Sequence, residues 1–247
     1  MNYKGEIILK RTQQSFKVGF SILYKNLECL SKDVDKLHPR EKNYYETLKF
    51  DKRKKSYLLG RLSAKEAIAE LLDKKEDIHN VCIDFGVFQF PVVKNTRDNI
   101  QVTISHCSDY GISLAYPEEH PLGIDIEKIE KDKIKTFKSM ITDQEEILLQ
   151  SSFFSILQGC TLIWTVKEAM SKVIKTGFTL DLNFFEIDTI KYYNEVIETT
   201  FKNFGQYKAF SFISGTYVCS IVLPKRSSIN LNGFKKAFKN STEITHN

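Results

Sequence analysis

Two acidic residues near the middle of the chain have the spacing of a divalent-cation site. Asp125 and Glu127 lie two residues apart in the segment Gly123-Ile-Asp-Ile-Glu. In a β-strand, residues two apart point to the same face, so both carboxylates share one face and both isoleucines share the other. Neighbouring carboxylates repel each other unless a cation lies between them. A solvated edge-strand face is the alternative of equal weight.

A third acid lies in a segment with helical spacing. Glu168 and Lys172 are four residues apart in Trp164-Thr-Val-Lys-Glu-Ala-Met-Ser-Lys, and therefore share one face of a helix. A surface ion pair, which contributes only about 0.3–0.5 kcal/mol, would also explain this spacing. Beside the strand pair, however, Glu168 would complete a set of hard oxygen ligands suited to Mg²⁺. Lys172 would then meet the charge that develops on a departing phosphate.

Helices that could carry these residues are predicted from apolar periodicity. The predicted helical ranges are 56–72, 142–150 and 162–175. Thr142, with Glu145 three residues later, has the capping-box pattern of a helix start. Gly177 is a typical residue for ending the last of these helices. The predicted helix 162–175 therefore contains both Glu168 and Lys172.

Short strands are predicted on both sides of these helices. Three strand-like segments joined by turn residues are expected to form one antiparallel sheet: 101–105, 111–116 and 122–129. Alternating patterns also predict strands in the last third of the chain: 184–190, 195–201 and 207–223. The polar tail that begins at Pro224 is expected to be disordered at its end.

The two longer predicted helices contain similar sequence segments. The segment Leu62-Ser-Ala-Lys-Glu-Ala-Ile resembles Trp164-Thr-Val-Lys-Glu-Ala-Met, with three identities at matching places. Duplication of a half-unit would explain the similarity. Chance similarity between two amphipathic helices explains it equally well.

Composition limits the class of protein. The 247 residues are 42% hydrophobic and carry a net charge of +5, which excludes a disordered chain and suits anionic partners. The five cysteines have no paired spacing, so neither a disulfide framework nor a zinc knuckle is indicated. No segment resembles a secretory leader or the roughly 20 apolar residues of a membrane span. These features predict a cytoplasmic protein without a membrane association.

A histidine precedes the acidic strand. His106 lies in Ser105-His-Cys and is expected in a loop just past the end of a strand. No second His or Cys stands at metal-ligand spacing, so zinc is not indicated. A structural hydrogen bond is the common role of a single histidine, and a phosphate or ribose contact is the functional alternative.

Taken together, three motifs resemble those of the Sfp-type 4'-phosphopantetheinyl transferases. That family has a Ser-His-Ser/Cys-like turn, a Gly-Ile-Asp-Ile-Glu strand and a Trp-x-x-Lys-Glu-Ala/Ser-x-x-Lys helix. The chain has the corresponding segments in the same order: 105–107, 123–127 and 164–172. The resemblance covers residues 59–178 well, and the two ends only by length and strand pattern.

The resemblance implies a fold and an activity. The expected fold is α+β, with two similar α/β subdomains, 1–120 and 121–247, packed as a pseudodimer. The expected enzyme transfers the 4'-phosphopantetheine group of coenzyme A to a serine of an apo acyl or peptidyl carrier protein and releases 3',5'-adenosine bisphosphate. Coenzyme A would lie in the cleft between the two halves. A monomer is the simplest expectation for two halves in one chain.

The resemblance also implies roles for particular residues. Asp125, Glu127 and Glu168 would hold Mg²⁺ together with the diphosphate of coenzyme A, and Lys172 would neutralise the leaving group. As a hypothesis, Glu168 takes the proton of the carrier serine, directly or through a water. The expected catalytic residues are therefore Glu168, Lys172 and Asp125.

The implied substrate contacts include one departure from the family pattern. Ser105 and His106 would contact the 3'-phosphate end of coenzyme A. The family often has Gly-Lys-Pro ahead of the Ser-His turn, whereas residues 86–91 keep the proline and lack the lysine. Basic residues that could supply the missing phosphate contact, or form a solvated basic face, are Arg40, Lys42, Arg53 and Arg61, of which Lys42 and Arg61 are taken as substrate-binding candidates.

Two other functions fit parts of the pattern. A magnesium-dependent nuclease or phosphodiesterase would also use strand acids and a nearby lysine. Such enzymes usually place the lysine two residues after the acid, where this chain has Ile129. A non-catalytic basic binding module would need none of the acids. The resemblance favours the transferase, with coenzyme A and a carrier protein as partners and no nucleic acid.

Overall fold

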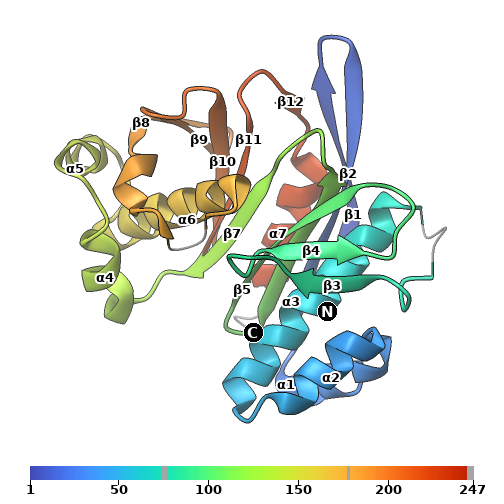
Figure 1. The fold of residues 1–247 in the computed structure, drawn as a ribbon. Coiled ribbons are helices and arrows are strands. Elements are labelled where there is room, and N and C mark those ends of the chain that lie inside the picture. The colour runs from blue at the N-terminus through green and yellow to red at the C-terminus, as the bar shows by residue number, and fades with distance from the viewer. Residues whose placement is uncertain (74–76, 177–178, 244–247) are drawn as a thin grey trace. The chain divides into compact units, whose positions relative to one another are not determined.

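The computed structural model describes residues 1–73, 77–176 and 179–243, and the chain divides into two compact units (Figure 1). The first unit is Met1–Pro121 together with the C-terminal segment that begins at Ser228, and the second unit is Leu122–Ser227. The internal boundary falls one residue from the expected division at 120/121. Each unit combines helices with an antiparallel sheet, so the α+β class is confirmed.

The C-terminal segment differs from expectation. It forms α7 (Asn232–Glu243) and belongs to the first unit, whereas the sequence analysis assigns it to the second; the end of the tail that is expected to be disordered, at 244–247, lies outside the described residues. The reason is apolar burial. Phe234 and Phe238 of α7 are almost fully buried, and the Phe234 ring packs edge-on against Phe20. An amphipathic helix with buried aromatic residues is stabilised by the core that it covers.

The first unit contains a five-stranded antiparallel sheet covered by a long helix. The sheet has the order β12-β1-β2-β6-β5, with strands Ser228–Ile229, Asn2–Arg11, Gln14–Tyr24, Tyr110–Pro117 and Ile100–Cys107. Helix α3 (Asp51–Leu71) packs on β2, β6 and β5. The prediction of a helix at 56–72 is confirmed, although α3 begins five residues earlier.

Smaller elements complete the first unit. Before α3 come α1 (Leu27–Ser31), η1 (Val34–Lys36) and α2 (Pro39–Thr47), and after it comes the hairpin of β3 (Cys82–Phe85) and β4 (Pro91–Lys94). Helix α2 starts with a capping box in which the His38 side chain accepts from the backbone and Glu41 reaches back to the N-cap residue. This box fixes the position of Glu41.

The second unit has its own sheet, of order β7-β11-β10-β9-β8. Its strands are Gly123–Lys128, Tyr217–Pro224, Tyr207–Ser214, Val196–Phe201 and Ile187–Tyr193. Helix α6 (Ile156–Ile174) packs on β7 and β11. The remaining elements are η2 (Lys131–Lys133), α4 (Ile134–Lys138), α5 (Asp143–Gln150) and η4 (Leu182–Phe185). The predicted capping box at Thr142 is confirmed.

Three details of the sequence prediction need correction. The segment 122–129 forms β7, which lies in a different sheet from β5 and β6, because its hydrogen-bonding partner is the distant strand β11. Helix α6 starts six residues before the predicted start, at a capping box formed by Ser155 and Gln158. It ends at Ile174 with Lys175 in the left-handed conformation, and the predicted stop at Gly177 lies outside the described residues.

The two units repeat one order of elements. The series β2, α2, α3, β3, β4, β5, β6 of the first unit matches β7, α5, α6, β8, β9, β10, β11 of the second. In both, the helix is hydrogen-bonded to the sheet by hydroxyl groups: Ser63 to Ser113 at 2.7 Å, and Thr165 to Ser220 at 2.8 Å. The similarity between the two helix sequences therefore marks equivalent positions.

Glycines bring each long helix close to its sheet. A Cβ at Gly19 of β2 would lie 2.0 Å from the Ala67 carbonyl oxygen, and one at Gly123 of β7 would lie 1.9 Å from that of Ala169. Only a residue without a side chain allows such an approach. The match makes β7 the equivalent of β2, so Asp125 occupies the place that Ser21 has in the first unit.

No described helix is both long and apolar enough to cross a membrane.

Candidate functional site

Strand β7 holds the two strand acids with the expected alternation. Ile124 and Ile126 are fully buried on one face. Asp125, on the other face, is only 4% exposed, and it pairs in register with Ser220 of β11. Ser220 is hydrogen-bonded to Thr165 of α6, so the Asp125 side of the strand is the side that α6 covers. The prediction that both carboxylates share one face, opposite the isoleucines, agrees with this burial pattern.

Lys172 joins α6 to β7. Its Nζ lies 2.7 Å from Oδ1 of Asp125 and donates to the carbonyl oxygen of Ile124 at 2.9 Å. The Asp125 side chain is 6% exposed and the Lys172 side chain 25% exposed. A charge-assisted hydrogen bond in such a site is stronger than one at the surface. The simple surface ion pair between Glu168 and Lys172 is therefore not what the structure shows.

Glu127 contacts a lysine that the sequence analysis did not single out. Nζ of Lys133, in the short turn η2, lies 2.7 Å from Oε2 of Glu127. Both side chains are partly exposed, at 36% for Lys133 and 20% for Glu127. Glu127 lies in β7 and Lys133 in η2, so neither strand nor helix spacing predicted this contact.

Glu168 is the acid whose environment is least favourable to a charge. It is 9% exposed, and its Oε1 atom is buried without a hydrogen-bond partner among the described residues. Burial raises the pKa of Glu168 to about 7, opposed by the positive charge of Lys172 and reinforced by the negative charges of Asp125 and Glu127. The three acids are thus close enough to interact electrostatically.

The three acids were predicted to hold a metal ion. Within the described part of the chain, no group of three or more His, Cys, Asp or Glu side chains is arranged to hold one, and Asp125 and Glu127 contact lysines instead. The donor set nevertheless fits Mg²⁺: carboxylate oxygens are its preferred protein ligands, and the buried Oε1 of Glu168 has no other described partner. The metal role of these residues stays a prediction.

The Ser-His segment lies in the first unit, within β5. His106 is therefore in a strand, not in the predicted loop past the strand end. The Ser105 side chain is buried and His106 is exposed, as expected for neighbouring residues that point to opposite faces of a sheet. The two side chains consequently do not form one contact surface.

Arg61 and Lys42 occupy different environments. The Arg61 guanidinium is 6% exposed and stacks on the rings of Tyr57 and Phe85, at 4.9 and 4.6 Å to the ring centroids. Its Nε and Nη2 atoms have no hydrogen-bond partner among the described residues, and Nε lies 3.9 Å from Glu41. Arg61 is therefore not part of a solvated basic face. Lys42 is partly exposed and pairs with Asp35 at 2.8 Å.

Comparison with known proteins identifies the second unit. Residues 121–222 match the sequence profile of the 4'-phosphopantetheinyl transferase superfamily. This range is therefore similar to the 4'-phosphopantetheinyl transferase superfamily. The matched range contains Asp125, Glu127, Glu168 and Lys172, and the resemblance inferred from the motifs is confirmed.

Two curated relatives of the chain carry related names. The chain is 30% identical over 139 residues to the 4'-phosphopantetheinyl transferase gsp of Aneurinibacillus migulanus, a match that covers 53% of each protein. It is 40% identical over 68 residues to the holo-[acyl-carrier-protein] synthase of Mycoplasma mycoides subsp. mycoides, covering 27% of this chain and 61% of that protein. The chain thus spans about half to three-fifths of the length of these curated relatives.

One solved structure has a partial likeness. It is a holo-(acyl-carrier-protein) synthase from Bacillus anthracis str. Ames in complex with CoA (3',5'-ADP), with 19% sequence identity and a TM-score of 0.35. The match covers 44% of this chain and 96% of that one. A likeness of this size supports no inference about this chain.

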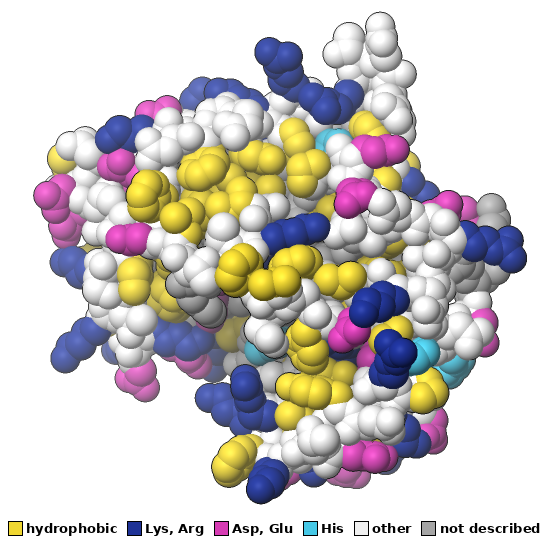
Figure 2. Space-filling view, in the orientation of Figure 1, with side chains coloured by type: hydrophobic (Ala, Val, Ile, Leu, Met, Phe, Trp, Pro, Cys, Tyr) yellow, Lys and Arg dark blue, Asp and Glu magenta, His cyan; other side chains and the backbone are white. Residues whose placement is uncertain are grey.

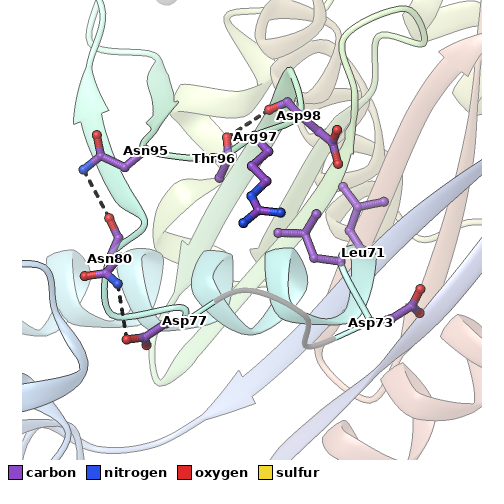
Figure 3. Close-up of a pocket in the computed structure, with 9 residues that line it drawn as sticks. Leu71, Asp73, Asp77, Asn80, Asn95, Thr96, Arg97 and Asp98 are labelled. Atoms are coloured by element: carbon purple, nitrogen blue, oxygen red, sulfur yellow. Dashed lines mark hydrogen bonds between the residues drawn. The ribbon is translucent and has the colours of Figure 1, made fainter.

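A polar pocket of the first unit lies outside the range that matches the superfamily (Figure 3). Its walls include Asp73, Asp77, Asn80 and Asp98, and Asn80 donates to Asp77 within it. None of the predicted site residues lines this pocket. It also adjoins residues 74–76, which lie outside the described ranges, so we assign it no role.

Proposed function

We propose that the chain transfers the 4'-phosphopantetheine group of coenzyme A to a serine of an apo acyl or peptidyl carrier protein. The observation that carries the proposal is the grouping of a buried Asp125–Lys172 pair with Glu168 inside a domain of the phosphopantetheinyl transferase superfamily. The names of the curated relatives agree with this activity.

The reaction needs one proton transfer and one displacement. The hydroxyl oxygen of the carrier serine forms a bond to the β-phosphorus of the coenzyme A diphosphate, the phosphorus on the pantetheine side. The bond from that phosphorus to the bridging oxygen breaks, and 3',5'-adenosine bisphosphate leaves with that oxygen. The hydroxyl proton passes to a base. The products are a serine phosphodiester and the bisphosphate, so atoms and charges balance.

Glu168 is the base in this proposal. A general base works best when its pKa lies near the working pH, and the pKa of Glu168 is raised to about 7. Its Oε1 atom has no competing hydrogen bond among the described residues. The carboxylate can therefore accept the serine proton directly or through a water.

Lys172 supports the leaving group. Its ammonium already neutralises Asp125 and lies near enough to Glu168 to lower the pKa of that carboxyl. The same positive charge would stabilise the negative charge that develops on the departing bisphosphate. Asp125 holds the ammonium in place through the 2.7 Å contact.

The proposal also includes a magnesium ion, which the three acids would hold beside the diphosphate of coenzyme A. Asp125, Glu127 and Glu168 would hold it, and it would supply neutralisation of diphosphate charge. Loading the site would require Glu127 to leave Lys133, which the exposure of that pair allows.

The proposed contacts to coenzyme A lie in the first unit. His106 is exposed and can meet the 3'-phosphate end through its side chain, whereas Ser105 is buried and would contribute only after a local change. Lys42 is accessible, and Arg61 would need Tyr57 or Phe85 to move. We further propose a cytoplasmic monomer that does not bind nucleic acid.

The nuclease alternative gains no support. On the face shown in Figure 2, Lys and Arg side chains are interspersed with acidic ones and form no continuous basic stripe among the described residues. A phosphate-tracking groove would need such a stripe. Incubation of the protein with plasmid DNA and Mg²⁺ tests this alternative, and cleavage would revive it.

Mass spectrometry tests the proposed transfer. A panel of apo carrier proteins is incubated with coenzyme A, Mg²⁺ and the unaltered chain, and we expect one or more carriers to gain the phosphopantetheine mass. The Glu168→Gln variant should slow the transfer at least about 100-fold. No mass gain on any carrier would contradict the activity, and near-normal transfer by the variant at saturating Mg²⁺ would contradict the role of Glu168.

A further inference from the structure

Lys167 is adjacent to Glu168 in sequence but contacts a different set of residues. Its Nζ donates to Oε2 of Glu145 at 2.7 Å and to the carbonyl oxygen of Met140 at 2.6 Å. Both charged side chains are completely buried. A ligand arriving from solvent therefore cannot reach this ammonium group in the described arrangement.

Glu145 extends the contact to two further elements. Its Oε2 atom accepts from the backbone of Thr142 at the start of α5, and its Oε1 atom accepts from the backbone of Ile187 at the start of β8, both at 2.9 Å. One carboxylate thus connects α5, β8 and, through Lys167, helix α6. A buried ion pair needs such complete hydrogen bonding to be stable, so the positions of these elements depend on one another.

Glu168 has no comparable support of its own. The buried Oε1 atom of its carboxylate has no hydrogen-bond partner among the described residues, so the direction of the side chain depends on the α6 backbone. Successive residues of a helix are rotated by about 100° around the axis, and a turn of α6 that displaces Lys167 displaces Glu168 as well. The Thr165–Ser220 hydrogen bond holds the sheet side of α6, and the Lys167–Glu145 pair holds another side.

The first unit contains the same pair at the equivalent place. Lys65 of α3 lies 3.0 Å from Oε2 of Glu41, and Oε1 of Glu41 accepts from the backbone of Ile83 at 2.9 Å. Lys65 is followed by Glu66, the equivalent of Glu168, but Ser21 stands where the second unit has Asp125. The pair therefore occurs once beside a candidate site and once without one.

We propose that Lys167 is a positioning residue: paired with Glu145, it fixes the rotation of α6 on which the aim of the buried Glu168 carboxylate depends, and it does not bind substrate. The importance of that aim for transfer rests on the proposed function above. The motif Trp-x-x-Lys-Glu would thus combine a lysine that orients the helix with a glutamate that faces the site.

Two variants distinguish a loss of Glu168 positioning from a general loss of protein stability. Lys167→Met removes the ammonium beside Glu168, and Lys65→Met removes the equivalent ammonium in the other unit. The measurements are the thermal midpoint, the Mn²⁺ affinity by isothermal titration well below that midpoint, and the kcat and KM for coenzyme A. We expect both variants to lose stability, but only Lys167→Met to weaken Mn²⁺ binding, by about tenfold or more. Its kcat should fall while its KM for coenzyme A stays within about twofold.

Two results would overturn the inference. A raised KM for coenzyme A with unchanged Mn²⁺ affinity would show that Lys167 contacts substrate. Equal losses of Mn²⁺ affinity in both variants would show a general effect of instability. If Lys167→Met does not fold, Glu145→Gln, which keeps the size of the side chain, is compared with Glu41→Gln by the same criteria.

The proposed function fails in a different way. An unaltered chain that binds Mn²⁺, with an affinity that depends on Lys167, but transfers nothing to any carrier would refute the activity and leave the positioning role in place. Transfer by the unaltered chain, with a Mn²⁺ affinity that Lys167→Met does not change, would refute the positioning role alone.

Discussion

The ammonium group of Lys172 lies 2.7 Å from Asp125, and its charge also lowers the pKa of Glu168, which burial raises to about 7. One lysine on α6 therefore acts on both an acid of the strand and an acid of its own helix. This coupling makes the ionisation of Glu168 sensitive to the charge of Lys172, although the hydrogen bonds of Lys172 go to Asp125 and Ile124.

Replacing Lys172 should raise the pKa of Glu168. In a Lys172→Met variant the opposing positive charge is gone, so burial and the two neighbouring acids act without it and the pKa moves above about 7. The measurement is a pH titration of the metal-free protein labelled with ¹³C at glutamate side chains. Lys138→Met, which removes an exposed lysine paired with Glu146, serves as the control. An unchanged or lower Glu168 pKa in Lys172→Met would contradict the coupling.

The stability of the metal-free protein should depend on Glu168 and pH. Because the folded state raises the pKa of this carboxyl from 4.5 to about 7, the folded protein binds more protons than the unfolded chain in that window. Stability contributed by Glu168 therefore falls as the pH rises from about 4.5 to 7, by up to roughly 3 kcal/mol. The Glu168→Gln variant has no ionisable group at this position, so it does not lose this stability as the pH rises.

Urea denaturation at pH 5 and pH 8 tests the prediction. We expect the free energy of unfolding of Glu168→Gln, relative to that of the unaltered protein, to be higher at pH 8 than at pH 5. The comparison cancels the titration of groups that both proteins share. The same stability difference at both pH values would show that Glu168 ionises as freely in the folded protein as in the unfolded chain.

Gly123 should not tolerate a side chain. A Cβ there would lie 1.9 Å from the Ala169 carbonyl oxygen, so Gly123→Ala must push α6 away from β7, at a cost of about 3 kcal/mol. Transfer activity should fall as well, since both sides of the site move apart. Gly205→Ala is the matched control, because nothing lies within 4 Å of its added carbon. Equal midpoints for the two variants in thermal denaturation would contradict the close packing.

Helix α7 should contribute strongly to the stability of the first unit. Phe238 is 1% exposed, and Phe238→Ala should cost about 3–5 kcal/mol through lost burial and the cavity that remains. Phe50→Ala, at a position that is 73% exposed, should change the free energy of unfolding by less than about 0.5 kcal/mol. Similar urea midpoints for the two variants would show that α7 is only loosely attached.

Sequence spacing predicted which residues share a face of a strand or helix, but not which residues they contact across elements. Period-two spacing placed Asp125 and Glu127 on one face, and helical spacing placed Glu168 and Lys172 together, because both rules depend only on local geometry. The partner of Lys172 proved to be Asp125, a contact between residues 47 apart in sequence. No local rule predicts such a contact.

The same limit explains the errors in the fold. The strand at 122–129 was expected beside its sequence neighbours, but its partner β11 lies about ninety residues later. Strand β1 went unpredicted although buried Ile7 and Leu9 alternate with exposed Glu6 and Lys10, and the structure shows it paired along its length with β2. The repeat of Lys-Glu-Ala in α3 and α6 left chance open as an explanation, and the matching buried lysines are what now argue against it.

Because the C-terminal helix α7 belongs to the first unit, the order in which the two units can fold during synthesis is affected. The second unit is continuous in sequence, whereas the first unit needs Phe234 and Phe238, which a ribosome adds after every strand of the second. Domains tend to fold as they emerge. The first unit, which contains the N-terminus, is therefore completed last. A truncated product that stops before residue 232 would leave the aromatic core of the first unit exposed and prone to aggregation.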